Sequence, residues 1–306
     1  MIVVAGEALV DLILHPDGRL AAVPGGGPFN TARTIGRLGG RVGFLGRLST
    51  DRFGAMLRAS LVTDGVDLEH TLSTDAPTTL AIAELDEAGV ATYRFHTAET
   101  SAPGLDDADV RAALRSVPEA VHIGTLGLVL EPMAAALAAG IRSLGEATLL
   151  MVDPNCRPRV IGDRVAYMAR LDGILARADV VKVSADDLDY MAPGDGTRSA
   201  ARGLLAAGPT VILLTDGAGS VTVIGRRFEA SLPVPSVPVV DTVGSGDAFG
   251  GAFLARWVER GLGRSDLGDA DAVIEAVTRA IEVAGLTCGR PGADPPTRLE
   301  AGWPTV

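Results

Sequence analysis

Short apolar runs alternate with alanine- and leucine-rich stretches along most of this chain, and this alternation restricts the fold more than any other feature. The candidate strands are rich in β-branched residues and lie at 2–7, 42–46, 120–124, 148–153, 180–184 and 210–216. They show no polar alternation, which is typical of strands buried on both faces of a parallel sheet. The intervening stretches predict helices near 30–38, 51–63, 107–115, 131–144, 163–176, 186–191 and 197–206, with further helices after residue 247. The pattern predicts an open α/β sandwich.

Two segments depart from the alternation and predict hairpins instead. Residues 78–96 predict two strands around a turn at 87–89, and residues 9–23 predict a similar pair around 16–18. The two hairpins could form a small sheet that covers a site, or they could be an ordinary extension of the sheet edge. Periodicity alone favours neither interpretation.

Charge and cysteine content narrow the set of partners. A formal net charge of -11 argues against a nucleic acid or an anionic membrane surface as partner. The two cysteines, Cys156 and Cys288, lie far apart in no metal-ligand spacing, which fits a reducing cytoplasm. No basic segment precedes the first apolar run, and no apolar run has membrane-spanning length. We therefore expect a cytoplasmic globular protein without a nucleic-acid or membrane partner.

The stretch DTVGSGDAFGGAF, residues 241–253, places an aspartate directly after a glycine-rich turn. Gly244 and Gly246 can adopt a positive φ and leave backbone N–H groups open to a ligand. If a helix begins near Ser245, those groups and the helix dipole favour an anion, for which phosphate is the natural candidate. Asp247 would then lie in the first helical turn.

Asp247 has two interpretations at that position. An acidic residue in the first turn of a helix is common and interacts favourably with the helix dipole. In phosphoryl transfer, the same carboxylate could orient a hydroxyl and accept its proton while the amides of 244–247 neutralise charge on the transferred group. The positive helix end is expected to keep Asp247 ionised, as a weak base that is always available.

The chain resembles the ribokinase-like (PfkB) carbohydrate kinases. The stretch 241–253 is similar to their C-terminal signature, and PGGGPFNTARTIGRLGG (24–40) is similar to their N-terminal one. GEALVDL (6–12) and DPNCRPRV (153–160) resemble bacterial fructokinases in particular. The resemblance covers essentially the whole chain. It implies a three-layer α/β/α sandwich with a mainly parallel central sheet and a small β lid.

The resemblance also implies the organisation of the chain and its partners. Residues 1–306 would form a single kinase domain, from which lid strands at about 9–23 and 76–99 project. The lid would close over a sugar, exclude water from ATP, and offer a surface through which a homodimer could form. The resemblance implies ATP and Mg as cofactors, with K as a further candidate.

Site residues follow from the matching positions. The implied catalytic group is Asp247, with an anion hole formed by Gly244, Ser245 and Gly246. Bare glycine backbone allows close approach to a sugar, and an asparagine offers both a donor and an acceptor. The implied sugar-binding residues are Asp11, Gly26, Gly27, Asn30, Asn155 and Arg157. The implied nucleotide-binding residues are Ser184, Thr215, Gly217, Ala284 and Gly292. Asp187 would hold Mg through water, and Asp241 could hold K.

Some positions depart from the family pattern. Ser184 and Asp187 stand where the family usually carries N-x-x-E, so the charge at the second position lies on a shorter arm. Ser220 replaces the usual last glycine of the segment that contains Gly217. Pro296 stands where a serine helps to hold a monovalent cation in ribokinase, which lowers the expectation of potassium. The sequence also lacks G-K-[ST], so ATP would be held by amides and metal and not by a P-loop.

These observations predict ATP-dependent phosphorylation of a sugar hydroxyl, with fructose as the expected substrate and fructose 6-phosphate as the product. Phosphorylation of 2-keto-3-deoxygluconate and phosphorylation of ribose remain alternatives. For the keto acid, Arg157 or Arg33 could pair with the carboxylate of the substrate. From a different class of protein, a non-catalytic sugar-binding sensor with the same fold is a further alternative.

Overall fold

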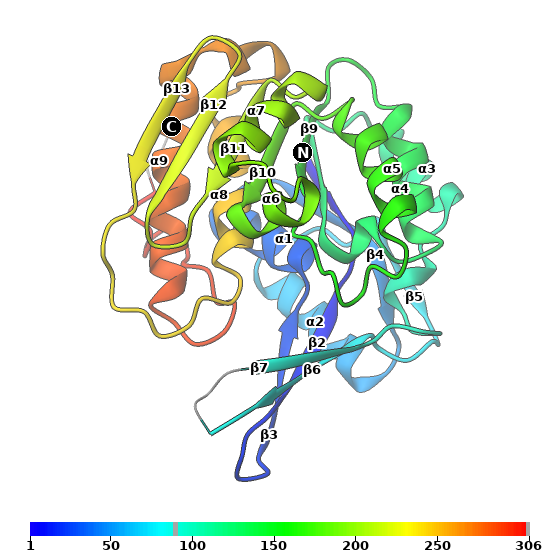
Figure 1. Ribbon diagram of the computed structural model, residues 1–306. Coiled ribbons are helices and arrows are strands. Elements are labelled where there is room, and N and C mark those ends of the chain that lie inside the picture. Colours follow the sequence, from blue (N-terminus) through cyan, green and yellow to red (C-terminus); the bar gives the residue numbers. More distant parts are fainter. Residues whose placement is uncertain (88–90, 304–306) are drawn as a thin grey trace.

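A large, mainly parallel sheet forms the centre of the molecule (Figure 1). The computed structural model describes residues 1–87 and 91–303. The sheet has nine strands in the order β13-β12-β11-β10-β9-β8-β1-β4-β5. The strands are Ile2–Ala5 (β1), Val42–Ser49 (β4), Thr71–Thr74 (β5), Ala120–Gly124 (β8), Leu149–Asp153 (β9), Val180–Ser184 (β10), Val211–Thr215 (β11), Ser220–Gly225 (β12) and Glu229–Pro233 (β13).

Helices cover both faces of this sheet. They are Gly27–Arg37 (α1), Arg52–Thr63 (α2), Asp107–Leu114 (α3), Met133–Arg142 (α4), Arg164–Leu175 (α5), Ala185–Met191 (α6), Thr197–Ala207 (α7), Ser245–Glu259 (α8) and Ala270–Cys288 (α9), with short 3-10 turns at Ala102–Gly104 (η1), Thr125–Leu128 (η2) and Arg264–Gly268 (η3). The helices α1, α2, α8 and α9 pack on one face, and α3 to α7 pack on the other. Alternate residues of β1, such as Val3 and Val4, belong to the two separate cores.

The predicted sandwich of strands and helices is confirmed. Every predicted core strand is present, and neighbouring ones pair in parallel. The strands β5, β12 and β13 were not predicted. They lie at the two edges of the sheet, and β12 and β13 pair antiparallel next to β11. Polar residues interrupt them, such as Ser73 in β5, Thr222 in β12 and Ser231 in β13, so they lack the continuous apolar run by which the buried strands were found.

The two predicted hairpins form one small sheet that projects from the end of the large sheet (Figure 1). It contains Leu9–Leu14 (β2), Leu20–Gly25 (β3), Leu80–Leu85 (β6) and Ala91–His96 (β7), in the order β3-β2-β6-β7. Each hairpin is antiparallel, and a parallel β2–β6 pairing joins them. Of the two predicted turns, the one at 16–18 is present, whereas residues 88–90 of the other lie outside the described residues.

No helix among the described residues is long and apolar enough to cross a membrane. Helix α1 begins at Gly27, three residues before the predicted start at 30, because Pro28 occupies one of its first positions, where a missing N–H costs nothing. This earlier start brings Gly27 and Asn30 onto the first turn of one helix. Both residues therefore face the end of the large sheet from which the small sheet projects.

Candidate active site

A cavity of about 620 Å³ lies between the small sheet and the carboxyl ends of the parallel strands. This edge of an open α/β sheet is where ligands usually bind. Leu9 and Asp11 of β2 and Tyr93 and Phe95 of β7 line the cavity from the side of the small sheet. The small sheet is therefore a cover over the cavity and not only an extension of an edge. The structure so decides between the two interpretations that periodicity left open.

The glycine turn forms the wall opposite the small sheet. Gly244 has φ 75°, in the left-handed region, and α8 begins at the next residue, as predicted. A Cβ at Gly244 would lie 2.4 Å from the Cβ of Ala293, so both the backbone conformation and the space require glycine. The first N–H groups of a helix have no acceptor within the helix, and here they lie beside the cavity. The geometry of the turn suits an anion, and the binding of an anion there stays a prediction.

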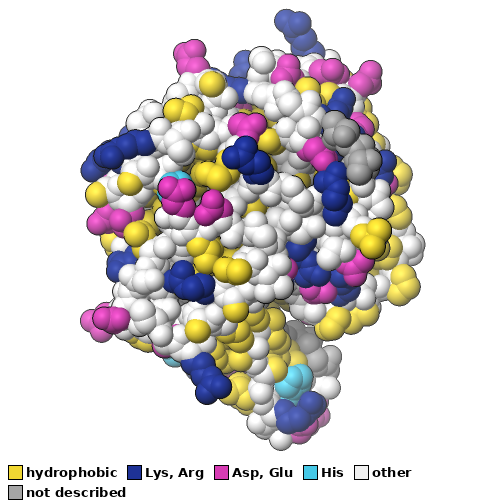
Figure 2. All heavy atoms as spheres, turned by 180° about the vertical axis from the view of Figure 1, so that it is seen from behind, with side chains coloured by type: hydrophobic (Ala, Val, Ile, Leu, Met, Phe, Trp, Pro, Cys, Tyr) yellow, Lys and Arg dark blue, Asp and Glu magenta, His cyan; other side chains and the backbone are white. Residues whose placement is uncertain are grey.

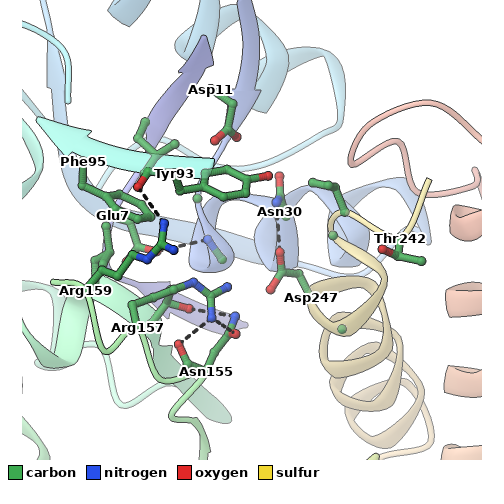
Figure 3. A pocket seen from close by; sticks show the side chains of 18 of the residues that line it. Glu7, Asp11, Asn30, Tyr93, Phe95, Asn155, Arg157, Arg159, Thr242 and Asp247 are labelled. Carbon is green, nitrogen blue, oxygen red and sulfur yellow. Dashed lines mark hydrogen bonds between the residues drawn. The ribbon is translucent and has the colours of Figure 1, made fainter. Parts of the chain in front are cut away.

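Asp247 and Asn30 meet across the cavity from two different helices (Figure 3). Asn30 Nδ2 donates a hydrogen bond of 2.9 Å to Asp247 Oδ2. Burial raises the pKa of Asp247, and the hydrogen bond from Asn30 and the nearby charges of Lys182 and Arg157 oppose that rise without cancelling it. Asp247 was expected to be kept ionised by the positive helix end, and loss of water on burial acts against that effect by raising the pKa. The carboxylate is consequently a stronger base than expected.

Asp11 and Glu7 add two more carboxyl groups to the site. Burial, and then the charge of Asp247, raise the pKa of Asp11 to about 6, while Arg157 lowers it. Glu7 is fully buried and accepts hydrogen bonds from the amides of Gly27 (3.1 Å) and Gly127 (3.0 Å). Burial raises the pKa of Glu7 to about 8. Glu7 was not among the predicted site residues. The signal in the sequence that could have identified it is an acidic residue directly after a buried strand.

Arg157 lies on the other side of the cavity, with Asn155 (Figure 3). Arg157 Nη1 donates to Asn155 Oδ1 at 2.5 Å and to the Asn155 carbonyl at 3.0 Å. Asn155 has φ 38°, an uncommon backbone conformation that often marks a functional position. Arg159, which was not predicted, reaches the small sheet and donates to the Tyr93 carbonyl at 3.4 Å. The 153–160 segment thus connects the sheet end to the lid.

Lys182 is a third residue of the site that was not predicted. It lines the cavity from β10 and forms a buried ion pair with Asp153, at 2.9 Å between Nζ and Oδ2. A clear signal was available in the sequence. Lys182 is the only lysine of a chain whose other basic residues are all arginines, and it stands within an apolar strand.

The predicted nucleotide-binding residues are not among the described residues that line the cavity. Ser184 and Thr215 are adjacent at the ends of β10 and β11. Ser184 and Asp187 form a capping box at the start of α6, and Asp187 Oδ1 also accepts from the Cys156 amide at 2.6 Å. Gly217 has φ 48° in the turn after β11. Their role in nucleotide binding stays a prediction.

The remaining predicted residues lie near the C-terminal loop. Asp241 accepts from the amides of Gly292 (2.9 Å) and Val243 (3.0 Å), so it joins that loop to the start of the glycine turn. Gly292 has φ 68°. Ala284 lies on α9 and packs against the core. Gly26 has φ 110° and caps α1 beside Gly27.

Comparisons with known proteins agree on one family. The model of the pfkB family of carbohydrate kinases matches residues 1–299. A fructokinase of Rhizobium leguminosarum bv. trifolii is 33% identical over 260 residues, covering 83% of this chain and 79% of that protein. The structure of a fructokinase from Xylella fastidiosa with bound ATP has a TM-score of 0.90 at 28% identity, covering 98% of this chain and 96% of that one. The structure of a Vibrio cholerae fructokinase with fructose, ADP and calcium ion has a TM-score of 0.82 at 25% identity, covering 95% and 94%.

The chain belongs to the PfkB family of carbohydrate kinases. It has the ribokinase-like fold, and it is an ATP-dependent sugar kinase similar to bacterial fructokinases.

Proposed function

We propose that this kinase phosphorylates fructose on the C6 hydroxyl. The observation that carries the proposal is the hydrogen bond from the Asn30 amide, on α1, to the Asp247 carboxylate, in the first turn of α8, at the wall of the cavity. Asp11 faces the same cavity from the lid and can accept hydrogen bonds from sugar hydroxyls. The similarity to fructokinases, one of them solved with bound fructose, supports fructose over other sugars.

In the proposed mechanism, Asp247 acts as the base. The sugar oxygen attacks the γ-phosphorus of ATP, the bond to the bridging oxygen breaks, and the hydroxyl proton passes to Asp247 as ADP leaves. A loose transition state requires positioning and charge stabilisation more than a strong base. The amides of Gly244, Gly246 and Asp247 can stabilise the charge, whereas the Ser245 amide already donates to the Thr242 carbonyl at 3.3 Å. The raised pKa of Asp247 favours acceptance of the proton.

Magnesium would neutralise charge on the phosphates of ATP. Direct binding by Asp187 does not fit, because both of its oxygens already accept hydrogen bonds from Ser184 and from the Cys156 amide. The described residues also contain no cluster of three or more His, Cys, Asp or Glu side chains suited to a metal. We therefore propose that Asp187 contacts the ion through water. Potassium near Asp241 remains part of the proposal, to be tested by its omission.

A panel of sugars tests the proposed substrate. ADP release from Mg-ATP is measured with fructose, ribose and 2-keto-3-deoxygluconate, each with and without potassium. We expect fructose to give the highest kcat/KM, by about 10-fold or more, because a site built to hydrogen-bond particular hydroxyls rejects sugars that leave those groups unpaired. The Asp247→Asn protein, purified in the same way, controls for contaminating kinases.

A keto acid is the second candidate, because Arg157 and Arg159 both line the cavity. Two guanidinium groups can bind a carboxylate that fructose lacks. Preferential turnover of 2-keto-3-deoxygluconate would move the assignment to this substrate. Turnover of ribose alone would contradict both assignments.

We also propose a homodimer that forms through the small sheet. Figure 2 shows hydrophobic side chains gathered over this projection, where Leu14 and Leu20 are 38% and 62% exposed. Apolar surface of this kind marks protein contacts. We expect light scattering to give twice the mass of the chain at micromolar concentration, and Leu20→Asp to shift the protein toward the monomer. A wild-type protein that stays monomeric at high concentration would contradict the dimer.

A further inference from the structure

Lys182 is a buried cation in the cavity for which the mechanism above has no use. Its side chain is 6% exposed, and it extends from β10 to line the site. Lysine is almost never fully buried unless it is paired. In a chain that otherwise uses only arginine as a basic residue, the single lysine lies at this place. A compact ammonium fits a narrow space that a planar guanidinium would overfill.

Asp153 holds the ammonium from the neighbouring strand. Lys182 Nζ donates to Asp153 Oδ2 at 2.9 Å, and the other oxygen, Oδ1, is buried without a hydrogen-bond partner. Burial by itself would lower the pKa of Lys182, but Asp153 and the more distant carboxylates Asp187 and Asp247 outweigh it, so the pKa is raised. The side chain therefore stays charged.

The ammonium lies against the first turn of α8. A Cβ on Gly246 would come within 2.9 Å of Lys182 Nζ, so Gly246 leaves the room that the ammonium occupies. The two glycines of the turn thus have separate tasks: Gly244 permits the backbone turn, and Gly246 admits the lysine. The helix N-terminus and the ammonium bring positive charge to the same point.

Two of the three ammonium protons remain for a ligand. Among the hydrogen bonds between described residues, Asp153 is the one acceptor that Lys182 has. Lys182 lines the same cavity as Gly244, Gly246 and Asp247, which form the predicted anion site. An anion in that site would meet amides from one side and the ammonium from another.

We propose that Lys182 is a catalytic residue that donates hydrogen bonds to the phosphoryl group during its transfer, and that Asp153 is the residue that positions it. The inference rests on the proposed transfer at the start of α8, whichever sugar is the acceptor. Lys182 keeps its proton throughout. It stabilises the oxygens of the phosphoryl group while the bond to ADP breaks and the bond to the sugar forms, and Asp247 takes the hydroxyl proton.

Because Lys182 is the only lysine, lysine labelled at Nζ with nitrogen-15 gives one side-chain NMR signal, which needs no assignment. Mg-ADP is added first, and aluminium fluoride is added second to form a planar mimic of the phosphoryl group. We expect a small change with Mg-ADP, a large shift with aluminium fluoride, and slower exchange of the ammonium protons. A signal that aluminium fluoride leaves in place, although calorimetry shows the complex to have formed, would overturn the proposal.

Kinetics of a matched set of variants separate catalysis from structure. Lys182→Met leaves Asp153 buried and unpaired and can fail to fold, so the double variant Lys182→Met/Asp153→Asn, which removes both charges, is measured beside it. We expect kcat of the double variant to fall by about 10²–10³, as for loss of one donor to a developing oxyanion, with sugar KM changed by less than about threefold. Asp153→Asn alone keeps the ammonium and is expected to lose less, about 10-fold.

Failure of the substrate assignment and failure of the proposal for Lys182 would give different results. If the double variant folds and keeps kcat within about threefold of the wild type, the pair is structural and the proposal is wrong. If the wild type acts on no sugar in the panel while aluminium fluoride still shifts the lysine signal, the substrate assignment fails and the role of Lys182 stands.

Discussion

Replacing Asp247 with asparagine is expected to lower kcat by about 10³–10⁴, the largest effect of any single substitution proposed for this kinase. The amide of the new residue can still accept from Asn30, so the hydrogen bond between α1 and α8 is kept, but it cannot accept a proton from the sugar. The sugar KM should change little, because the loss occurs in the transition state. Initial rates at saturating Mg-ATP measure this.

Asp11→Asn is the matched control for this experiment. Both carboxylates face one cavity and both have raised pKa values, but Asp11 comes from the small sheet, whereas Asp247 belongs to the first turn of α8. We expect Asp11→Asn to raise the sugar KM by about 10-fold and to leave most of kcat. Equal losses in kcat for the two variants would show that Asp247 has no special part in proton transfer.

The pH dependence of kcat provides a second test of Asp247. A base with a raised pKa loses its active, ionised form at a higher pH than an ordinary aspartate does, so kcat should begin to fall on the acid side at a higher pH than an ordinary aspartate would give. The acid limb should be absent from the residual activity of Asp247→Asn.

Gly244→Ala is expected to reduce kcat by about 10²-fold and to lower the stability of the protein. The residue has φ 75°, which costs an alanine about 1 kcal/mol, and the new Cβ would lie 2.4 Å from Ala293 Cβ. The start of α8 must move to relieve the contact, and with it the amides and Asp247. Displacement of a reacting group by about 1 Å can cost 10²-fold in rate. Steady-state kinetics and thermal melting measure the two effects.

The chain provides a close control for this substitution in Gly261. It follows the other end of α8 with φ 68°, but a Cβ there meets nothing within 4 Å. Gly261→Ala should therefore show the cost in stability without the loss of kcat. Adding Ala293→Gly to Gly244→Ala should recover part of the rate. No recovery would mean that strain in the backbone, and not the contact, disturbs the site.

Patterns local in sequence predicted the frame of the site well. The buried parallel strands, the start of α8 after Gly244, and the placement of Asn30 at the start of α1 all depend on neighbours within a few residues. The contact of Asn30 with Asp247 joins residues far apart in the chain, and it could be anticipated only because the order of the two signatures resembles that of a known family.

Interactions between neighbouring strands were harder to predict. The pairing of Lys182 with Asp153 depends on β9 and β10 lying side by side, and nothing within either strand specifies the partner. The rise in the pKa of Asp247 was not predicted for a related reason. The helix end is visible in the sequence, whereas the burial that raises the pKa depends on segments far apart in the chain, such as the one that carries Asn30.

The hydrogen bond of Glu7 restricts how the hairpin of β2 and β3 can move relative to α1. The hairpin of β2 and β3 leaves the body of the protein just after Glu7 and returns just before Gly27, and the Glu7 carboxylate ties these two points together through the Gly27 amide. This hydrogen bond therefore fixes the base of the hairpin. Asn30 lies about one helical turn after Gly27 on α1. The parallel pairing of β2 with β6 couples the second hairpin to the first. We therefore expect movement of the small sheet to reach Asn30, the hydrogen-bond partner of Asp247.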